Sequence, residues 1–132
     1  MAKRDEIIAF CDELLDIGSF TDYGPNGLQV PGNEEVGLVA SAVSAHQESI
    51  DAAIATGADL LVTHHGLFWD FHPRALTPPM ARRLKAALGA GLSVAGYHLP
   101  LDAHPEIGNN ALLCRSLGFE PGPEQIGEAK GR

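Results

Sequence analysis

Two adjacent histidines follow an apolar run in the segment LLVTHHGLFWDFH, residues 60–72. Neutral imidazoles are the commonest side-chain ligands for transition metals, so His64 and His65 are candidates for a metal site. The chain has six histidines, however, and an adjacent pair arises by chance often enough that the doublet alone decides nothing. The residues that lie near the pair in the fold must therefore support or weaken this interpretation.

A second group with suitable chemistry is YHLPLD, which contains His98 and Asp102. A carboxylate has two oxygens and is suited to bridging two metal ions that lie about 3.5–4 Å apart. A mixed set of imidazoles and a carboxylate favours zinc, iron, manganese or nickel over calcium, which prefers oxygen ligands alone. The sequence therefore predicts that His64, His65 and Asp102 hold two divalent transition-metal ions, with His98 as a catalytic proton shuttle or a further ligand.

Alternating elements are predicted to position these groups. Apolar residues recur at helical spacing in four segments, and three apolar runs are typical of buried strands. The resulting order, βαβαβα, predicts an α/β three-layer sandwich with a mainly parallel sheet and helices on both faces. The segment 21–33 is rich in glycine, proline and asparagine and is predicted to be a loop. The predicted strands are 36–43, 59–63 and 92–97, and the predicted helices are 7–15, 47–56, 80–88 and one capped by Asn109 or Asn110.

Both histidine motifs begin where a predicted strand ends. Ligands of such sheets gather beyond the carboxyl ends of the strands, and neighbouring strand tips lie about 5 Å apart. Consecutive residues of a regular strand point to opposite faces, so we expect His64 and His65 to lie just past the strand, where Gly66 permits a bend. His98 and Asp102 are then expected to converge with them on one pocket.

Purely structural roles compete with this interpretation. The doublet could fill a strand-end loop, Asp102 could accept backbone hydrogen bonds in a turn, and His98 could be a hydrogen-bonded core residue. Other histidines have weaker claims, and His46 has the weakest because it is expected to be a surface residue at the start of a helix. The others are His72 and His104.

The composition and the absence of other sequence motifs exclude several classes of function. Nine basic and seventeen acidic residues give a net charge of −8, so general nucleic-acid binding is not expected. The chain lacks an apolar run of roughly 18 residues and a signal-peptide core, so we expect a cytoplasmic protein without membrane contact. Cys11 and Cys114 are predicted to be buried free thiols. No CxxC, GxSxG, P-loop or GxGxxG motif occurs, which leaves the histidine–aspartate set as the reactive group.

Three segments together resemble one family: TDYGPNGLQV, GADLLVTHHGLFW and YHLPLDAHPEIGNNALL. Their order and spacing are similar to the interacting-factor-three-like family, also labelled type-two GTP cyclohydrolase I homologs, and closest to its short bacterial type. The resemblance implies a two-lobe α/β fold, ring-like homo-oligomers that are often hexamers, and a dinuclear metal centre facing an interior cavity. By this resemblance His64, His65 and Asp102 are metal ligands, His98 lies beside the metals, and Asn26 and Gly27 have a structural role.

The sequence departs from that family in length. Family members are roughly twice as long, and their second half supplies another histidine and a glutamate to the metal centre. We therefore expect residues 1–120 to form the metal-binding lobe and 121–132 to be a tail or the start of a second lobe. The chain could be a fragment, a natural half-length protein completed by another subunit, or a remnant that binds metal weakly.

The function expected from the sequence and its resemblance is that of a dinuclear metal-binding protein. It would be a metal-dependent hydrolase of a nucleotide or phosphoester that uses a metal-activated water. The family label implies GTP ring opening, but no purine pocket is identifiable and the substrate stays unknown. The alternative is a non-catalytic metal-binding assembly or regulatory module.

Overall fold

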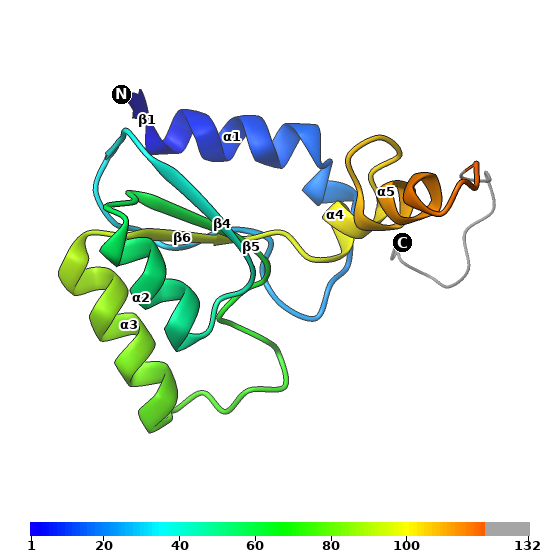
Figure 1. The fold of residues 1–132 in the computed structure, drawn as a ribbon. Coiled ribbons are helices and arrows are strands. Elements are labelled where there is room, and N and C mark those ends of the chain that lie inside the picture. The colour runs from blue at the N-terminus through cyan, green and yellow to red at the C-terminus, as the bar shows by residue number, and fades with distance from the viewer. Residues whose placement is uncertain (121–132) are drawn as a thin grey trace.

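A four-stranded mixed sheet forms the centre of the protein, in the order β2-β6-β5-β4. Figure 1 shows it in the computed structural model, which describes residues 1–120. Strands β4, β5 and β6 are parallel, and β2 pairs antiparallel with β6 at one edge. A separate two-stranded antiparallel sheet joins β1 and β3. The strands are β1 (Ala2–Lys3), β2 (Gly27–Val30), β3 (Glu35–Val36), β4 (Val39–Ser44), β5 (Leu60–His65) and β6 (Ser93–Gly96).

Helices cover both faces of the central sheet, so the protein has the predicted α/β architecture. Helix α1 lies on one face, and α2 and α3 lie side by side on the other (Figure 1). The two short helices α4 and α5 follow β6 and extend away from the sheet. No helix within residues 1–120 combines the length and the apolar character needed to cross a lipid bilayer. The helices are α1 (Arg4–Leu14), the 3-10 turn η1 (Ile17–Ser19), α2 (Gln47–Ala55), α3 (Pro78–Ala90), α4 (Leu99–Ala103) and α5 (Asn109–Ser116).

Each face of the sheet has its own apolar core. Leu61 and Val94 pack toward α2 and α3, whereas Leu60 and Ala95 pack toward α1. Consecutive strand residues point to opposite faces, which is why neighbours in the sequence divide between the two cores. Leu60 and Leu61 are at most 1 % exposed, and full burial of such a side chain contributes roughly 1.5–3 kcal/mol.

A buried hydrogen bond connects α1 to the end of β6. The Tyr97 hydroxyl donates to Asp12 Oδ1 at 2.8 Å, and the Tyr97 side chain is almost completely buried. Burial raises the pKa of Tyr97 above its ordinary value, and the nearby Asp12 carboxylate adds to this effect. The phenol therefore stays neutral and keeps its donor hydrogen, which holds α1 against the strand that leads into His98.

The structure confirms the mainly parallel sheet, and it corrects several local predictions. The segment 21–33 was predicted to be a loop, but its centre forms β2, a short edge strand hidden among glycines and prolines. The predicted strand 36–43 is divided into β3 and β4. The backbone amides of Gly37 and Leu38 turn there to donate to Asp59 Oδ2 at 2.8 and 3.0 Å, which interrupts regular pairing.

Other corrections concern the ends of elements and the thiols. His64 and His65 are the last two residues of β5 and do not lie past it, contrary to the prediction. Helix α3 continues through Gly89 and is capped by Gly91 at a φ of 68°, a conformation that glycine adopts without strain. The N-cap of α5 is Gly108, and neither asparagine that follows takes that position. Cys11 and Cys114 are free, as predicted, but they are only partly buried.

Replacing Leu61 with alanine tests the core on the α2 and α3 face. Leu61→Ala leaves a cavity in a fully buried site, and we expect it to lower the free energy of unfolding by about 2–5 kcal/mol. The matched control is Leu88→Ala, because Leu88 is 56 % exposed on α3 and alanine preserves helix propensity. Urea denaturation followed by circular dichroism measures both changes, and equal losses would contradict this arrangement of the core.

Candidate metal centre

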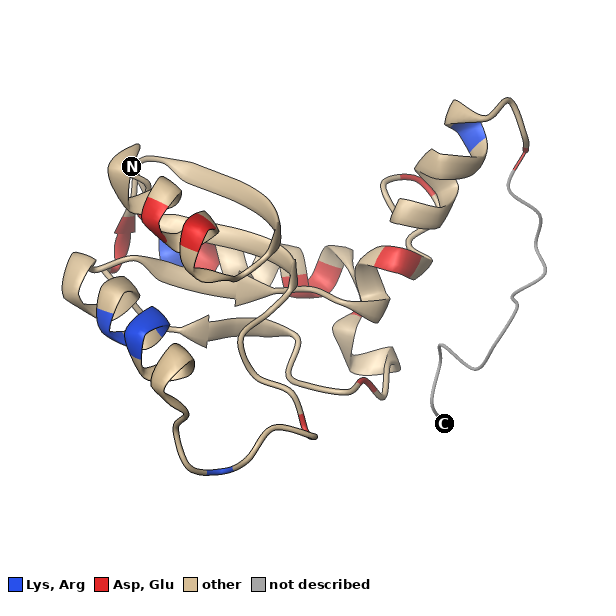
Figure 2. Cartoon of the chain, turned by 60° about the horizontal axis from the view of Figure 1, so that its bottom comes forward, with Lys and Arg blue, Asp and Glu red and all other residues tan. Residues whose placement is uncertain are grey.

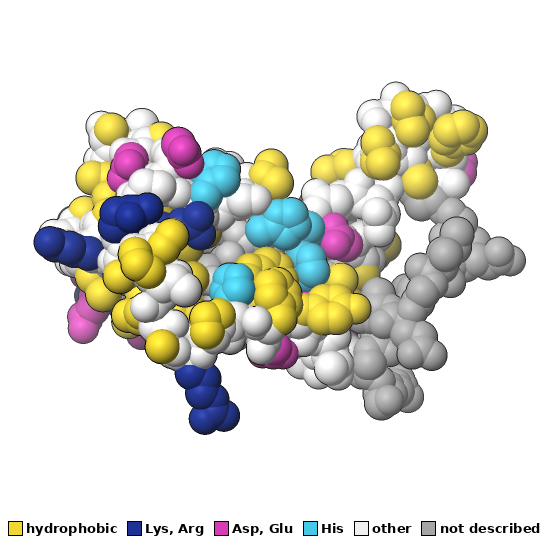
Figure 3. All heavy atoms as spheres, turned by 90° about the horizontal axis from the view of Figure 1, so that it is seen from below, with side chains coloured by type: hydrophobic (Ala, Val, Ile, Leu, Met, Phe, Trp, Pro, Cys, Tyr) yellow, Lys and Arg dark blue, Asp and Glu magenta, His cyan; other side chains and the backbone are white. Residues whose placement is uncertain are grey.

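Three imidazoles meet at the carboxyl edge of the sheet. One ligand atom from each of His64, His65 and His98 can be chosen so that all three lie within 4.8 Å of one another. Strands β5 and β6 are parallel neighbours with Thr63 paired to Gly96, so the residues that follow each partner emerge at the same edge. The histidine side chains gather on the face of the molecule shown in Figure 3, beside apolar side chains. The predicted convergence of the two motifs is therefore present in the fold.

Both histidines of the doublet reach this cluster from the end of β5. The parity of the strand places His64 on the α1 face and His65 on the α2 and α3 face. The strand ends at His65, where the side chains are no longer held apart by regular pairing. The two ring centroids lie 4.5 Å apart, and the ring planes meet at an angle of 52°. Their centroids lie 5.0 and 5.6 Å from that of His98. Their position at the end of the strand thus lets both histidines reach the cluster, a role that the sequence prediction gives to a bend at Gly66.

Two glycines allow the loops at this edge to approach one another. A Cβ on Gly96 would lie 3.0 Å from the Gly66 Cα, which is too close for the neighbouring strand end to remain in place. A Cβ on Gly66 would collide with the side chain of Gln29. Gln29 Oε1 accepts a hydrogen bond from the Leu67 amide at 2.6 Å, and Gln29 Nε2 donates to the Pro25 carbonyl at 2.7 Å. The edge strand β2 therefore ties the loop around residue 25 to the loop that follows the doublet.

Asp102 lies against the cluster from helix α4. Its Oδ1 atom is 2.9 Å from His64 Nε2, yet that nitrogen is buried without a hydrogen-bond partner among the described residues. The two atoms are close, but their angles are not those of a hydrogen bond. Two ligands of one zinc ion, each about 2.0–2.2 Å from the metal, lie roughly 3.3 Å apart in a tetrahedral site. The observed 2.9 Å is somewhat shorter, so the two groups would move apart slightly to hold one ion between them.

Asn109 holds that carboxylate from the start of α5. Its Nδ2 donates to Asp102 Oδ1 at 2.8 Å, and the Asp102 side chain is 28 % exposed. The sequence placed Asn109 as a possible helix cap, but its side chain instead orients a residue of the site. This contact fixes Asp102 relative to the helix that follows.

A buried carboxylate that sequence reasoning missed orients His98. Asp22 Oδ1 lies 2.7 Å from His98 Nδ1, and the Asp22 side chain is only 2 % exposed. Burial raises the pKa of Asp22, but hydrogen bonds from His98, Asn26 and two backbone amides outweigh it and lower the pKa below its usual value. A carboxylate can only accept, so His98 Nδ1 carries the hydrogen and Nε2 is the free lone pair. This arrangement resembles the carboxylate–histidine pairs that orient metal ligands and catalytic bases.

The loop that carries Asp22 is joined to the site by further hydrogen bonds. The Asn26 side chain donates to Asp22 at 3.0 Å and accepts from the His98 amide at 2.7 Å, while the Leu99 amide donates to Asp22 at 2.9 Å. An aspartate and an asparagine four residues apart in a loop rich in glycine and proline were a visible signal. Nothing in the sequence, however, placed that loop beside residue 98.

His65 is held from the opposite side of the cluster. Its Nδ1 lies 2.9 Å from the Ser44 hydroxyl at the end of β4, which leaves Nε2 free. Burial lowers the pKa of His65, and the neighbouring imidazoles of His64 and His98 lower it further, against a smaller raising effect of Asp102. His65 is therefore neutral at physiological pH, as a metal ligand must be.

The other histidines are not part of this cluster. His46 Nδ1 contacts the Ser49 hydroxyl at 3.0 Å at the start of α2. His104 Nδ1 accepts from two backbone amides, both at 3.2 Å, and so closes a turn. His72 lies exposed in the loop before α3. Among the residues of the described chain, the only group with metal-ligand spacing is His64, His65 and His98. It includes His98 but not the predicted ligand Asp102, which contacts His64 alone of the three.

The chain is similar to known proteins over nearly its whole length. The model of the Duf34/NIF3 (NGG1p interacting factor 3) family matches residues 2–128. A protein of Archaeoglobus fulgidus named "GTP cyclohydrolase 1 type 2 homolog" is 48 % identical over 128 residues, which is 96 % of this chain and 51 % of that protein. A protein of the same name from Neisseria meningitidis is 45 % identical over 119 residues, or 90 % of this chain and 48 % of the relative.

A solved structure shares the fold. The crystal structure of TTHA1606 from Thermus thermophilus superimposes with a TM-score of 0.89 at 39 % identity, over 99 % of this chain and 54 % of that one. This chain thus spans about half the length of the relatives that it matches.

The protonation state of His98 provides a test of the Asp22 contact. We expect His98 to carry its hydrogen on Nδ1 in the metal-free protein at pH 8, as read from long-range ¹H–¹⁵N correlation spectra. Asp22→Asn should give a mixture of tautomers and lower the free energy of unfolding by about 1–3 kcal/mol, because charge-assisted hydrogen bonds are lost. Asp70→Asn is the control, since Asp70 is exposed in the neighbouring loop. Identical His98 spectra in both variants would refute the proposed orientation.

Proposed function

The chain belongs to the Duf34/NIF3 (NGG1p interacting factor 3) family, and from this premise we propose that it is a metal-dependent hydrolase with a dinuclear centre. His64, His65 and Asp102 are the proposed ligands, and His98 is the proposed catalytic residue. The single observation that carries the proposal is the buried His64 Nε2, which faces Asp102 at 2.9 Å without a hydrogen-bond partner among the described residues. Leaving a buried nitrogen unpaired is costly unless another group satisfies it.

The donor set fits a divalent transition metal. Imidazole nitrogens with a carboxylate oxygen suit zinc, iron, manganese or nickel, and neither partly buried thiol lies in the cluster. A bound ion would supply Lewis acidity and would lower the pKa of a coordinated water toward neutrality. Ser44 and Asn109 hold His65 and Asp102 from outside the cluster, which is the support that metal ligands commonly have.

His98 is suited to accept a proton in the hydrolytic step. Its Nδ1 is fixed by Asp22, so its Nε2 lone pair is the one free to take a proton from an attacking water. The Asp22 carboxylate then lies against the imidazolium that forms and stabilises its positive charge. Trp69 contacts the His98 ring edge-on, with centroids 5.0 Å apart, and limits the space from which water can approach.

The names of the relatives supply the candidate reaction. Proteins named as GTP cyclohydrolase 1 type 2 homologs support hydrolytic opening of a nucleotide ring as the first activity to test, with phosphoester hydrolysis as the second. The proposal extends to a ring-like homo-oligomer in the cytoplasm, in which a second lobe or subunit contributes the remaining ligands. These assignments of assembly and location rest on the family resemblance and stay predictions.

One observation favours a second candidate function. The chain spans about half the length of its relatives, and the described residues bring three histidines and one aspartate to the cluster. Two ions with open positions for water need more ligands than these four residues offer. A metal-binding assembly or regulatory module without turnover is therefore the alternative.

Metal content tests the ligands. After equilibrium dialysis against zinc and removal of excess metal, we expect elemental analysis to find zinc bound to the wild-type chain. The double variant His64→Ala/His65→Ala should retain at most about a tenth of it, because loss of a ligand or its support commonly costs 10–100-fold in affinity. His46→Ala/His104→Ala is the matched control and should keep the wild-type content. Equal zinc in the two double variants would end the assignment of the doublet.

Turnover and metal content together test the role of His98. Loss of a general base commonly costs about 10²–10⁴-fold in rate, so His98→Ala should lose turnover by this factor while it keeps its zinc. The assays are formate release from GTP and product release from 4-nitrophenyl phosphate. If His98→Ala loses as much zinc as the doublet variant, His98 is a ligand and not the base. If metal-loaded wild-type protein turns over neither substrate, the non-catalytic module is supported.

A further inference from the structure

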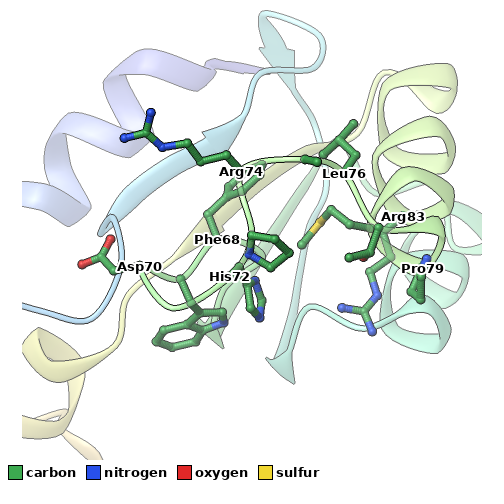
Figure 4. Close-up of a pocket in the computed structure, with 12 residues that line it drawn as sticks. Phe68, Asp70, His72, Arg74, Leu76, Pro79 and Arg83 are labelled. Atoms are coloured by element: carbon green, nitrogen blue, oxygen red, sulfur yellow. The ribbon is translucent and has the colours of Figure 1, made fainter.

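A cleft of about 510 Å³ lies beside the histidine cluster, between the loop at residues 68–77 and the start of α3 (Figure 4). This volume is typical of sites for small molecules. None of the four candidate residues of the metal centre lines the cleft. Phe68 and Trp69, however, line both the cleft and a small cavity that also borders His64 and His98. The two spaces therefore share an aromatic wall.

That wall contains the only tryptophan of the chain. The edge of Trp69 meets His98, and its face stacks on Phe71 with centroids 5.8 Å apart and an angle of 16° between the rings. Phe71 does not line the cleft and covers one face of Trp69, so a ligand ring in the cleft would have to meet the other face. Aromatic faces of this kind attract planar rings, because stacking adds to the burial of apolar surface. The wall is thus suited to a ligand with an aromatic ring.

Two basic residues, Arg74 and Arg83, and one acidic residue, Asp70, line the cleft, so its lining is slightly basic in an acidic protein. The chain carries a net charge of −8, yet residues 71–101 contain no aspartate or glutamate and four of the nine basic residues. Figure 2 shows basic residues on α3 and on the loop that precedes it. Such a local excess of basic residues steers an anion to this side of an otherwise acidic molecule. The four residues are Arg74, Arg82, Arg83 and Lys85.

Arg83 is the basic residue of the cleft that is best placed to contact a bound ligand directly. It lines the cleft and is partly buried, and its guanidinium makes no ion pair or hydrogen bond with any residue of the described chain. In Figure 4 the Arg83 guanidinium and the His72 ring point to the same side, whereas Arg74 and Asp70 turn away from them. A partly buried guanidinium without an acidic partner has five donors available for a ligand.

The start of α3 cannot replace Arg83 as the anion site. Pro78 and Pro79 occupy the first two positions of the helix and have no backbone N–H to donate. The amide of Ala81 already donates to the Thr77 carbonyl at 2.9 Å. Most of the donors with which a helix N-terminus usually binds phosphate are therefore absent here. Recognition of an anion in this cleft depends on side chains.

We infer that the cleft binds an aromatic phosphate ester, with the ring against Trp69 and the phosphate on Arg83. The inference rests on the proposed function, because it assigns the substrate class of the same centre. Trp69 lies between the cleft and His98, so this orientation directs the ring, and not the phosphate, toward the histidines. The site thus favours a substrate that reacts at its ring and uses the phosphate as an anchor.

Quenching of the single tryptophan measures this binding directly. We expect adenosine 5′-monophosphate to quench Trp69 fluorescence and to bind at least about tenfold more tightly than adenosine, because a charge-assisted pair with Arg83 is added. Arg83→Gln should weaken binding of the monophosphate by about tenfold or more and leave adenosine unchanged. Arg82→Gln is the matched control, since Arg82 is exposed, adjacent and outside the cleft. It should bind both ligands within twofold of wild type.

Two results would overturn the inference: equal affinities of the two glutamine variants for the monophosphate, or a monophosphate that binds no better than adenosine. Circular dichroism checks that Arg83→Gln folds. If it does not, Arg83→Lys and Arg82→Lys replace the pair, because lysine keeps the charge but loses the two-pronged contact. The Arg83→Lys variant is then expected to bind about threefold or more weakly than its control, and equal affinities refute the contact.

Titrations with and without zinc separate this inference from the proposed function. Arg83→Gln should keep the wild-type zinc content, because Arg83 lies outside the ligand cluster. Monophosphate binding that depends on Arg83 in a protein that binds no zinc would refute the metal centre and support the cleft. Zinc binding that depends on the histidine doublet, with no effect of Arg83 on the monophosphate, would support the metal centre and refute the cleft.

Discussion

Parallel pairing of β5 with β6 is the constraint on which the candidate centre depends. The pairing aligns Thr63 with Gly96, so the chain leaves both strands at one edge and carries the two histidine motifs to the same place. The apolar core on the α2 and α3 face extends almost to that edge, since Leu61 and Val94 are paired two residues before Thr63 and Gly96. A shift of register by one residue would exchange the faces of the two histidines and move apolar strand residues out of their cores, and the cores that flank the strands oppose such a shift.

Support for the site comes from elements that contribute no donor to the cluster. Asp22 fixes His98 from the loop before β2, Ser44 fixes His65 from β4, and Asn109 fixes Asp102 from α5. Asp22 and Ser44 each bind Nδ1 of their histidine and leave its Nε2 for the cluster, whereas Asn109 donates to Oδ1, the Asp102 oxygen that lies beside His64. The cluster is therefore held from three sides by hydrogen bonds, which is the condition under which ligands keep their geometry before a metal binds.

The cleft and the histidine cluster are adjacent but have different linings. Basic residues gather on the loop and helix beside the cleft, while the carboxylates of the site, Asp22 and Asp102, contact the histidines and do not line the cleft. Trp69 contacts His98 and lines the cleft, so it joins the two regions. If the cleft binds an anion as inferred, the basic residues beside it would attract that ligand, while Asp22 and Asp102 keep negative charge beside the histidines.

The sequence by itself determined the class of the fold and the residues with metal chemistry. Hydrophobic periodicity located three of the four central strands and placed both histidine motifs at strand ends, because burial imposes a repeat that is visible in a single chain. Strand β2, the position of the doublet inside β5 and the partners Asp22 and Asn109 were decided only by tertiary structure. Edge strands and hydrogen bonds between distant loops leave no periodic pattern, since they depend on which segments come together in space and not on which residues are neighbours in the chain.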